Sequence, residues 1–190
     1  MRVTTGLALT AVAWVSAGCS GVPLTAGADY EPGYDFAQYT SFTWDDPDPR
    51  PTGDPRLDGN PFFVHRLHAA IHWELSMRGI VEHASGPALS VHHHVSVRDR
   101  VEVFEADRAA GYTSEYGEGT QVIQYEEGTF LVDIADARTN AVLWRGWAQL
   151  DVTRALDDPD VMKEQIDQSI AKMFESFPIP AGGMPPTEGR

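Results

Sequence analysis

Two long stretches of alternating residues constrain the fold of this 190-residue chain more than any other feature. In the first stretch, polar residues separate apolar residues that share one parity. These apolar residues are Leu89, Val91, Val95, Val97, Val101 and Val103. The second stretch, 121–135, places Phe130, Val132 and Ile134 on one side. Because a period of two is typical of strands with one buried face, we expect an antiparallel hairpin joined through the Gly/Tyr-rich segment 106–119.

Two helices are predicted, one before this hairpin and one after it. The segment 60–79 begins with an Asn-Pro pair, which suits an N-cap and a first helical residue, and ends at a glycine, which suits a C-cap. Its buried stripe is expected to be Val64, Leu67, Ile71 and Leu75, widened by Phe63 and Ala70. The segment 158–177 begins with Asp-Pro and is followed by a proline, so it predicts the second helix.

Shorter alternating segments, 39–44 and 141–153, predict two more strands. In the later strand the inward-facing residues are expected to be Val142, Trp144, Ala148, Leu150 and Val152. Strands with a helix near the start and another at the end, without alternating βα units, indicate an α+β fold. We therefore expect a two-layer sandwich in which an antiparallel sheet with a long central hairpin carries two helices packed on one face.

The N-terminal residues predict export from the cytoplasm. One arginine is followed by the uncharged, mostly apolar run 6–15, which has a secretory layout and is too short to cross a bilayer. Cys19 is the only cysteine, so no intrachain disulfide is possible. The segment Ser16-Ala17-Gly18-Cys19 resembles the lipobox of bacterial lipoproteins, although Ser16 stands where leucine is usual. The alternative is ordinary secretion with a free thiol.

The lipobox resemblance implies palmitate-type acylation of Cys19 and attachment to a membrane through that lipid. Ser20, rather than aspartate, follows the cysteine, and by resemblance to the enterobacterial sorting rule this favours the outer membrane. The expected organisation is a signal peptide over 1–18, a flexible tether over 19–29, one α+β domain over 30–178 and a disordered tail over 179–190. The Pro- and Asp-rich segment 45–60 is expected to be a solvated loop.

Charge and motif content exclude several classes of function. The chain has 14 Lys and Arg against 28 Asp and Glu, a formal net charge of −14, so it lacks the basic surface that nucleic-acid binding requires. No Gly-rich phosphate loop follows a predicted strand, and no Gly-x-Ser-x-Gly elbow is present. We therefore expect no nucleic-acid partner, no cofactor and no enzymatic activity.

Histidine is the one chemically versatile residue that clusters. His65, His68 and His72 share an arc of the first predicted helix, and the i, i+4 spacing of the last two can bind zinc. Ala69 occupies the position of the general base of a metalloprotease helix, and the ordinary interpretation is a solvent-facing helix surface. In the cluster 92–94, strand alternation places His93 on the core side and its two neighbours on the opposite face.

Several segments together resemble the domain of unknown function 4136 family of bacterial envelope lipoproteins. The matching residues are Tyr34-Asp35-Phe36 with Tyr39, Phe42 and Trp44, then Arg78-Gly79, then Leu89, Val91 and His94, then Gly128-Thr129 and Trp144-Arg145-Gly146, and finally Phe177-Pro178. Ala88 and Ser90 depart from the usual Asp and Leu. The resemblance implies a periplasm-facing lipoprotein with a small two-layer sandwich and no assigned catalytic residues.

These observations lead to two expected functions. The first is a lipid-anchored, non-catalytic envelope domain with a binding or structural role, facing the periplasm from the inner leaflet of the outer membrane. Tyr112 and Tyr116 at the hairpin tip are the expected contact with an envelope protein partner. The alternative is a zinc- or copper-binding protein that uses His65, His68 and His72.

Overall fold

The computed structural model describes residues 23–45, 50–83, 89–105 and 120–179. Over these residues the chain forms a six-stranded sheet in the order β1-β6-β5-β4-β2-β3. The strands are β1 (Thr25–Tyr30), β2 (Ser41–Trp44), β3 (Val81–Glu82), β4 (Leu89–Glu105), β5 (Thr120–Asp136) and β6 (Val142–Asp151). The helices are α1 (Pro61–Ser76) and α2 (Pro159–Phe174), with a short 3-10 turn η1 at Phe36–Gln38.

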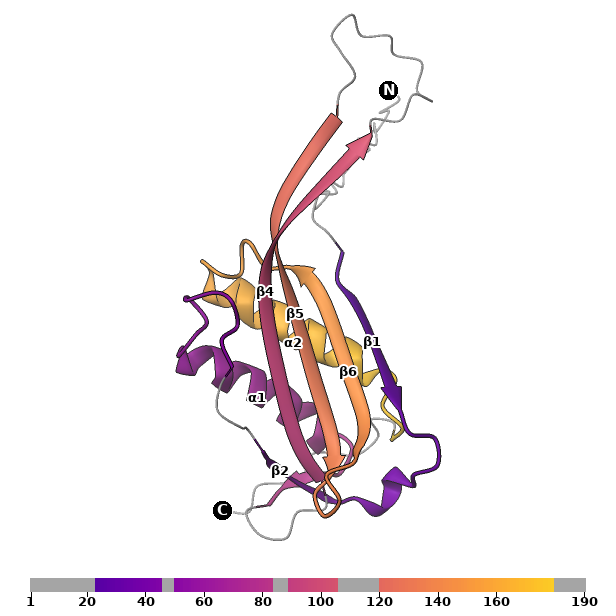
Figure 1. The fold of residues 1–190 in the computed structure, drawn as a ribbon. Helices are drawn as coiled ribbons and strands as arrows, with labels where there is room; N and C mark the ends of the chain where they lie inside the picture. The colour runs from indigo at the N-terminus through magenta and orange to yellow at the C-terminus, as the bar shows by residue number, and fades with distance from the viewer. Residues whose placement is uncertain (1–22, 46–49, 84–88, 106–119, 180–190) are drawn as a thin grey trace, which may run out of the picture.

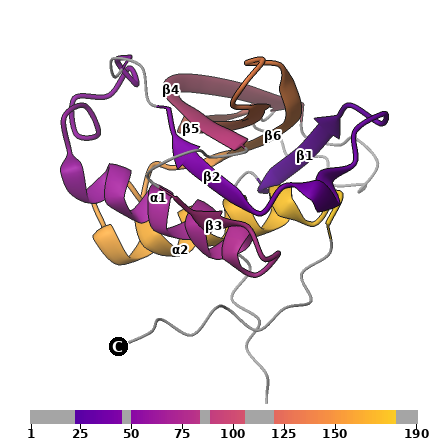
Figure 2. The ribbon, with the colours of Figure 1, turned by 90° about the horizontal axis from the view of Figure 1, so that it is seen from below.

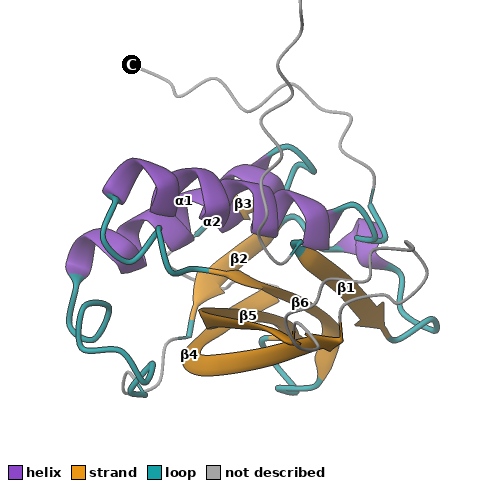
Figure 3. Cartoon of the chain, turned by 90° about the horizontal axis from the view of Figure 1, so that it is seen from above, coloured by secondary structure: helices purple, strands orange, loops and turns teal. Residues whose placement is uncertain are grey.

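The sheet and the helices form two layers. Seen along the strands, α1 and α2 lie side by side on one face of the sheet (Figures 2 and 3). At the centre of the sheet, β4 and β5 pair antiparallel along their whole length, from Leu89 opposite Asp136 to Glu105 opposite Thr120. The structure thus confirms the α+β two-layer sandwich, the long central hairpin and the placement of both helices on one face.

The sheet is mixed rather than antiparallel throughout, because β2 runs parallel to both β3 and β4. The chain leaves β2, passes through α1 on the face of the sheet and returns in β3, so the two strands point the same way. The described chain therefore contains one βαβ unit at this edge, although βα units do not alternate along it.

The fold begins earlier than expected. β1 pairs antiparallel with β6, from Thr25 opposite Gln149 to Tyr30 opposite Trp144. Leu24, Ala26 and Ala28 pack against the core. The second half of the segment expected as a flexible tether over 19–29 is therefore part of the sheet.

The core lies between the helices and the inner face of the sheet. Trp144 is fully buried there, and its ring lies 4.8 Å from the ring of Phe174 and 5.4 Å from that of Phe177. In α1 the expected stripe is buried except for Val64, which is 37% exposed. In β6, Val142 is 48% exposed and Leu143 is buried, because a register irregularity between Ile134 and Ala135 changes the parity.

Candidate functional site

The three histidines of α1 point in different directions. His65 is exposed at the surface of the helix. The ring of His68 stacks on Trp44 of β2, with 3.9 Å between ring centroids, and meets the ring of His93 edge-on at 4.9 Å. His72 lies edge-on to Phe42, and its Nδ1 is 3.4 Å from Oγ of Ser76. α1 therefore directs His68 and His72 against different neighbours.

Among the described residues, no group of three or more His, Cys, Asp or Glu side chains is placed to hold a metal ion. The i, i+4 spacing of His68 and His72 could not predict their separate ring contacts, because the aromatic neighbours Trp44 and Phe42 come from β2. The geometry gives the metal-binding alternative no support.

The histidines of β4 follow the predicted alternation. His93 faces the helices and contacts His68, whereas His92 and His94 lie on the opposite face of the sheet. Nε2 of His92 lies 3.2 Å from Oγ of Ser90 and 3.6 Å from a carboxylate oxygen of Asp45. This face thus carries a group of polar side chains where β2 ends beside β4.

A cavity of about 840 Å³ runs beside β4. The segment 50–59 and the first turn of α1 line one side of the cavity. Residues 92–95 of β4, the C-terminal half of β5 and the N-terminal end of β6 line the other side. The charged groups of this lining include Arg145 and Asp133, which form two hydrogen bonds of 2.6 Å each. Pairing with Asp133 raises the pKa of Arg145, so the positive charge of Arg145 is already neutralised by a carboxylate of the domain.

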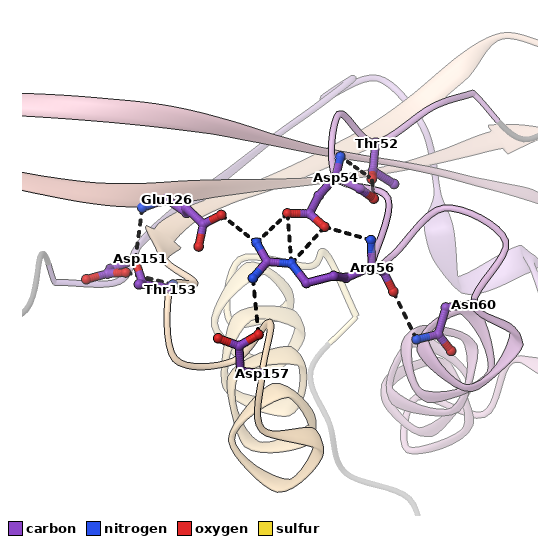
Figure 4. A network of polar contacts seen from close by, with 8 residues as sticks. All are labelled: Thr52, Asp54, Arg56, Asn60, Glu126, Asp151, Thr153 and Asp157. Carbon is purple, nitrogen blue, oxygen red and sulfur yellow. Dashed lines mark hydrogen bonds and ion pairs between the residues drawn. The ribbon is translucent and has the colours of Figure 1, made fainter.

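The segment 50–60 packs against the domain instead of extending into solvent as expected. Leu57 and Asp54 are both buried. The guanidinium of Arg56 lies among three carboxylates, those of Asp54, Glu126 and Asp157, from three parts of the chain (Figure 4). The hydrogen bonds from Arg56 hold the pKa of Asp54 below its usual range.

Arg56 therefore fixes one wall of the cavity to β5 and to the turn before α2. Sequence reasoning missed this arrangement, since the partners Glu126 and Asp157 are 70 and 101 residues away from Arg56. The only local signal was the Asp-x-Arg spacing of Asp54 and Arg56.

The β4–β5 hairpin extends well beyond the rest of the sheet. β6 ends at Asp151, which lies opposite Glu127 of β5. Beyond that point the hairpin has two strands, residues 99–105 and 120–126, which we call the overhang (Figure 1). Val101 and Val122 on the overhang are 58% and 54% exposed.

The overhang is ordered by cross-strand side-chain contacts. The hydroxyl of Tyr125 donates a hydrogen bond of 2.9 Å to Glu102, which raises the pKa of the tyrosine. Arg100 pairs with Glu127 at 2.9 Å at the base. The predicted contact residues Tyr112 and Tyr116 lie outside the described residues, as do Cys19, the signal segment 1–18 and the tail beyond 179.

The fold and the site define a small two-layer α+β domain with a cavity beside β4 and a protruding hairpin. The chain belongs to the family described as Domain of unknown function (DUF4136), whose model matches residues 27–179. This confirms the resemblance seen in the sequence. No curated protein matches the chain significantly.

Several solved structures are similar to this chain at low sequence identity. A PDZ domain protein from Parabacteroides distasonis ATCC 8503 is similar with a TM-score of 0.51 and 15% identity, over 83% of this chain and 36% of that chain. This chain thus spans little more than a third of that protein. The PelC dodecamer from Paraburkholderia phytofirmans has a TM-score of 0.47 at 12% identity, covering 85% of this chain and 100% of that chain. A minor lipoprotein from Acinetobacter baumannii has a TM-score of 0.38 at 13% identity, covering 73% and 91%.

No helix within the described ranges is long and apolar enough to cross a membrane.

Proposed function

We propose that this chain is a lipid-anchored, non-catalytic domain of the bacterial cell envelope that acts by binding, with the overhang as its contact region. The lipid is attached at Cys19, and the domain faces the periplasm from the outer membrane. The lipobox-like segment before Cys19 and the serine after it support the anchor and its location. Membership of the DUF4136 family is consistent with this proposal.

The observation that carries the binding role is the length of the overhang. A two-stranded ribbon is at best marginally stable in water, and this one adds seven residues per strand, of whose described side chains only Tyr125 is buried and none belongs to the core cluster. Val101 and Val122 stay exposed on it. Because stability of the fold does not account for such a ribbon, we assign it to contact with another envelope component.

Several carboxylates of the described residues take part in structural contacts. Hydrogen bonds from Arg56 lower the pKa of Asp54, and hydrogen bonds from Thr139 lower that of Asp136. Asp133 is held in an ion pair with Arg145. These contacts tie the three carboxylates to the fold.

The anchor is tested by expressing the full chain and Cys19→Ser in a bacterial host that is fed radiolabelled palmitate. We expect label and membrane association for the native chain, and an unlabelled, soluble Cys19→Ser protein. The purified variant should unfold at the same temperature as the native domain, since Cys19 precedes β1. An unlabelled native chain, or equal labelling of both proteins, would refute the anchor.

A further inference from the structure

The chain enters the fold at the end of the sheet from which the overhang projects. Thr25 pairs with Gln149, Gln149 with Thr129 and Thr129 with Ser96, so these four residues form one row across the sheet. β1 runs away from this row in the direction opposite to β4 (Figure 1). Pro23 and Leu24 therefore precede β1 at the end of the sheet from which the overhang projects.

The tether before β1, even at full extension, is shorter than the part of the hairpin that projects past the row of Thr25. Six residue steps separate Cys19 from Thr25, and at full extension they span at most about 20 Å. From the row of Thr25, β4 continues for nine residues, Val97 to Glu105, which is about 30 Å of strand. A domain held upright by a lipid on Cys19 would push the hairpin about 10 Å past the position of that cysteine, into the bilayer.

The surface of the overhang fits an uncharged lipid interface better than a charged one. Val101 and Val122 expose apolar side chains on one face of the hairpin. The overhang has one arginine, Arg100, against four acidic residues, so it offers no cationic patch to anionic headgroups. Contact with lipid would rest on apolar burial, which salt does not screen.

We propose that the overhang rests against the lipid bilayer that holds the anchor, with Val101 and Val122 at the interface. The inference depends on the proposed lipidation of Cys19. The short tether keeps the domain within reach of the membrane, and a hairpin longer than the tether then tilts the sheet until the overhang lies along the headgroups. Local confinement by the anchor makes even a small apolar contact effective.

The experiment uses the full-length chain, lipidated in a bacterial host and reconstituted into phosphatidylcholine vesicles that carry nitroxide-labelled lipid. Because Cys19 is acylated, a single cysteine introduced by Val122→Cys takes a fluorescent bimane label. Ala137→Cys is the matched control, since Ala137 is exposed in the turn after β5, at the opposite end of that strand. We expect nitroxide quenching at position 122 to exceed that at position 137 several-fold and to persist in 1 M salt.

The outcomes separate the inference from the proposed function. Acylation of Cys19 is read from the mass of the purified chain before reconstitution. Acylated protein with equal quenching at positions 122 and 137 would overturn the bilayer contact and leave the anchor standing. Chain without an acyl mass would refute the anchor and the inference together. Quenching that disappears at high salt would contradict the apolar contact. If position 122 is not quenched by lipid, and its bimane fluorescence changes only when a second envelope protein is added, the overhang would contact a protein partner instead.

Discussion

At the scale of single residues, Gly146 shows how the absence of a side chain leaves space for a buried aromatic ring. A Cβ at this position would lie 2.2 Å from Cη2 of Trp144, two residues earlier on the same face of β6. The indole ring lies along the strand over the glycine and is fully buried. The Trp-Arg-Gly sequence of β6 is therefore a packing unit, in which the glycine makes room for the tryptophan.

The first prediction concerns this unit. Gly146→Ala forces the ring of Trp144 out of its position, and we expect the free energy of unfolding to fall by about 1–3 kcal/mol. Urea unfolding of the soluble domain measures the change. Gly33→Ala is the control, since the nearest atom to its added Cβ is 4.0 Å away and little change is expected there. Equal unfolding midpoints for the two variants would show that the core tolerates the methyl group.

The second prediction concerns Asp54 and pH. The hydrogen bonds from Arg56 hold the pKa of Asp54 below its usual range in the folded protein, so the ionised carboxylate stabilises the fold at higher pH. This contribution is lost as the pH falls through the folded-state pKa. Asp54→Asn should lower the free energy of unfolding by about 1–3 kcal/mol at pH 7. The difference from the native domain should shrink below about pH 4.

The matched control for Asp54 is Asp157→Asn. Asp157 binds the same guanidinium at 3.2 Å, but its side chain is 77% exposed, so solvent screens the pair. We expect this variant to unfold at nearly the native urea concentration at every pH. If Asp54→Asn lowered the free energy of unfolding by the same amount at every pH, the loss would come from poor packing of the amide, and the charge of Asp54 would contribute little.

At the scale of elements, the sequence predicts the structure where the periodicity is long. The alternation from Leu89 to Val103 and the stripe of Leu67, Ile71 and Leu75 are each imposed by one continuous buried face, so β4 and α1 could be predicted. The strand β1, with the sequence TAGADY, has low β propensity and packs only small side chains, so it gives no such signal. Its position at the edge comes from pairing with β6, more than 110 residues later in the chain.

The local sequence pattern also does not predict the direction of a strand or its pairing register. β2 has four residues, and nothing in them distinguishes a parallel partner from an antiparallel one. The direction follows from the path of α1 between β2 and β3. The exposure of Val142 follows from one irregularity in pairing near Ile134, because a shift of one residue exchanges the two faces of a strand.

The third prediction treats the overhang as a separable element. Replacing residues 99–126 by Asn-Gly joins Arg98 to Glu127, which face each other across the hairpin, through a two-residue turn. The replacement removes Glu126, one partner of Arg56, so a loss of up to about 1 kcal/mol is expected. Far-UV circular dichroism and thermal unfolding of the variant should otherwise match those of the native domain. Global unfolding of this variant would show that the overhang supports the core.

At the scale of the whole molecule, a single layer of helices covers one face of the sheet, and the candidate site lies where distant segments meet. Arg56 joins the segment before α1 to β5 and to the turn before α2, so the wall of the cavity depends on contacts that form only in the complete fold. The sequence identified the histidines of α1 as a cluster but could not predict their neighbours, because stacking of His68 on Trp44 requires β2 to lie beside α1. The composition predicted the strongly acidic character of the chain, which follows from counting alone.

The last prediction concerns the limits of the folding unit. A chain that starts at residue 23 retains β1, whereas one that starts at residue 31 loses all six of its pairs with β6. Without β1, the packing of Leu24, Ala26 and Ala28 on the core is lost, and Trp147, which lies over Gly27, becomes more exposed. We expect the shorter chain to be less stable by at least about 2–3 kcal/mol. It should also self-associate, because β6 becomes an unprotected edge strand.

Urea unfolding and light scattering of the two chains, both without lipid and both ending at residue 190, measure these differences. The full mature sequence from residue 20 serves as the control and should match the chain that starts at residue 23. Equal unfolding midpoints for chains starting at 23 and 31 would make β1 a dispensable part of the tether and would contradict its role as the edge strand that covers β6.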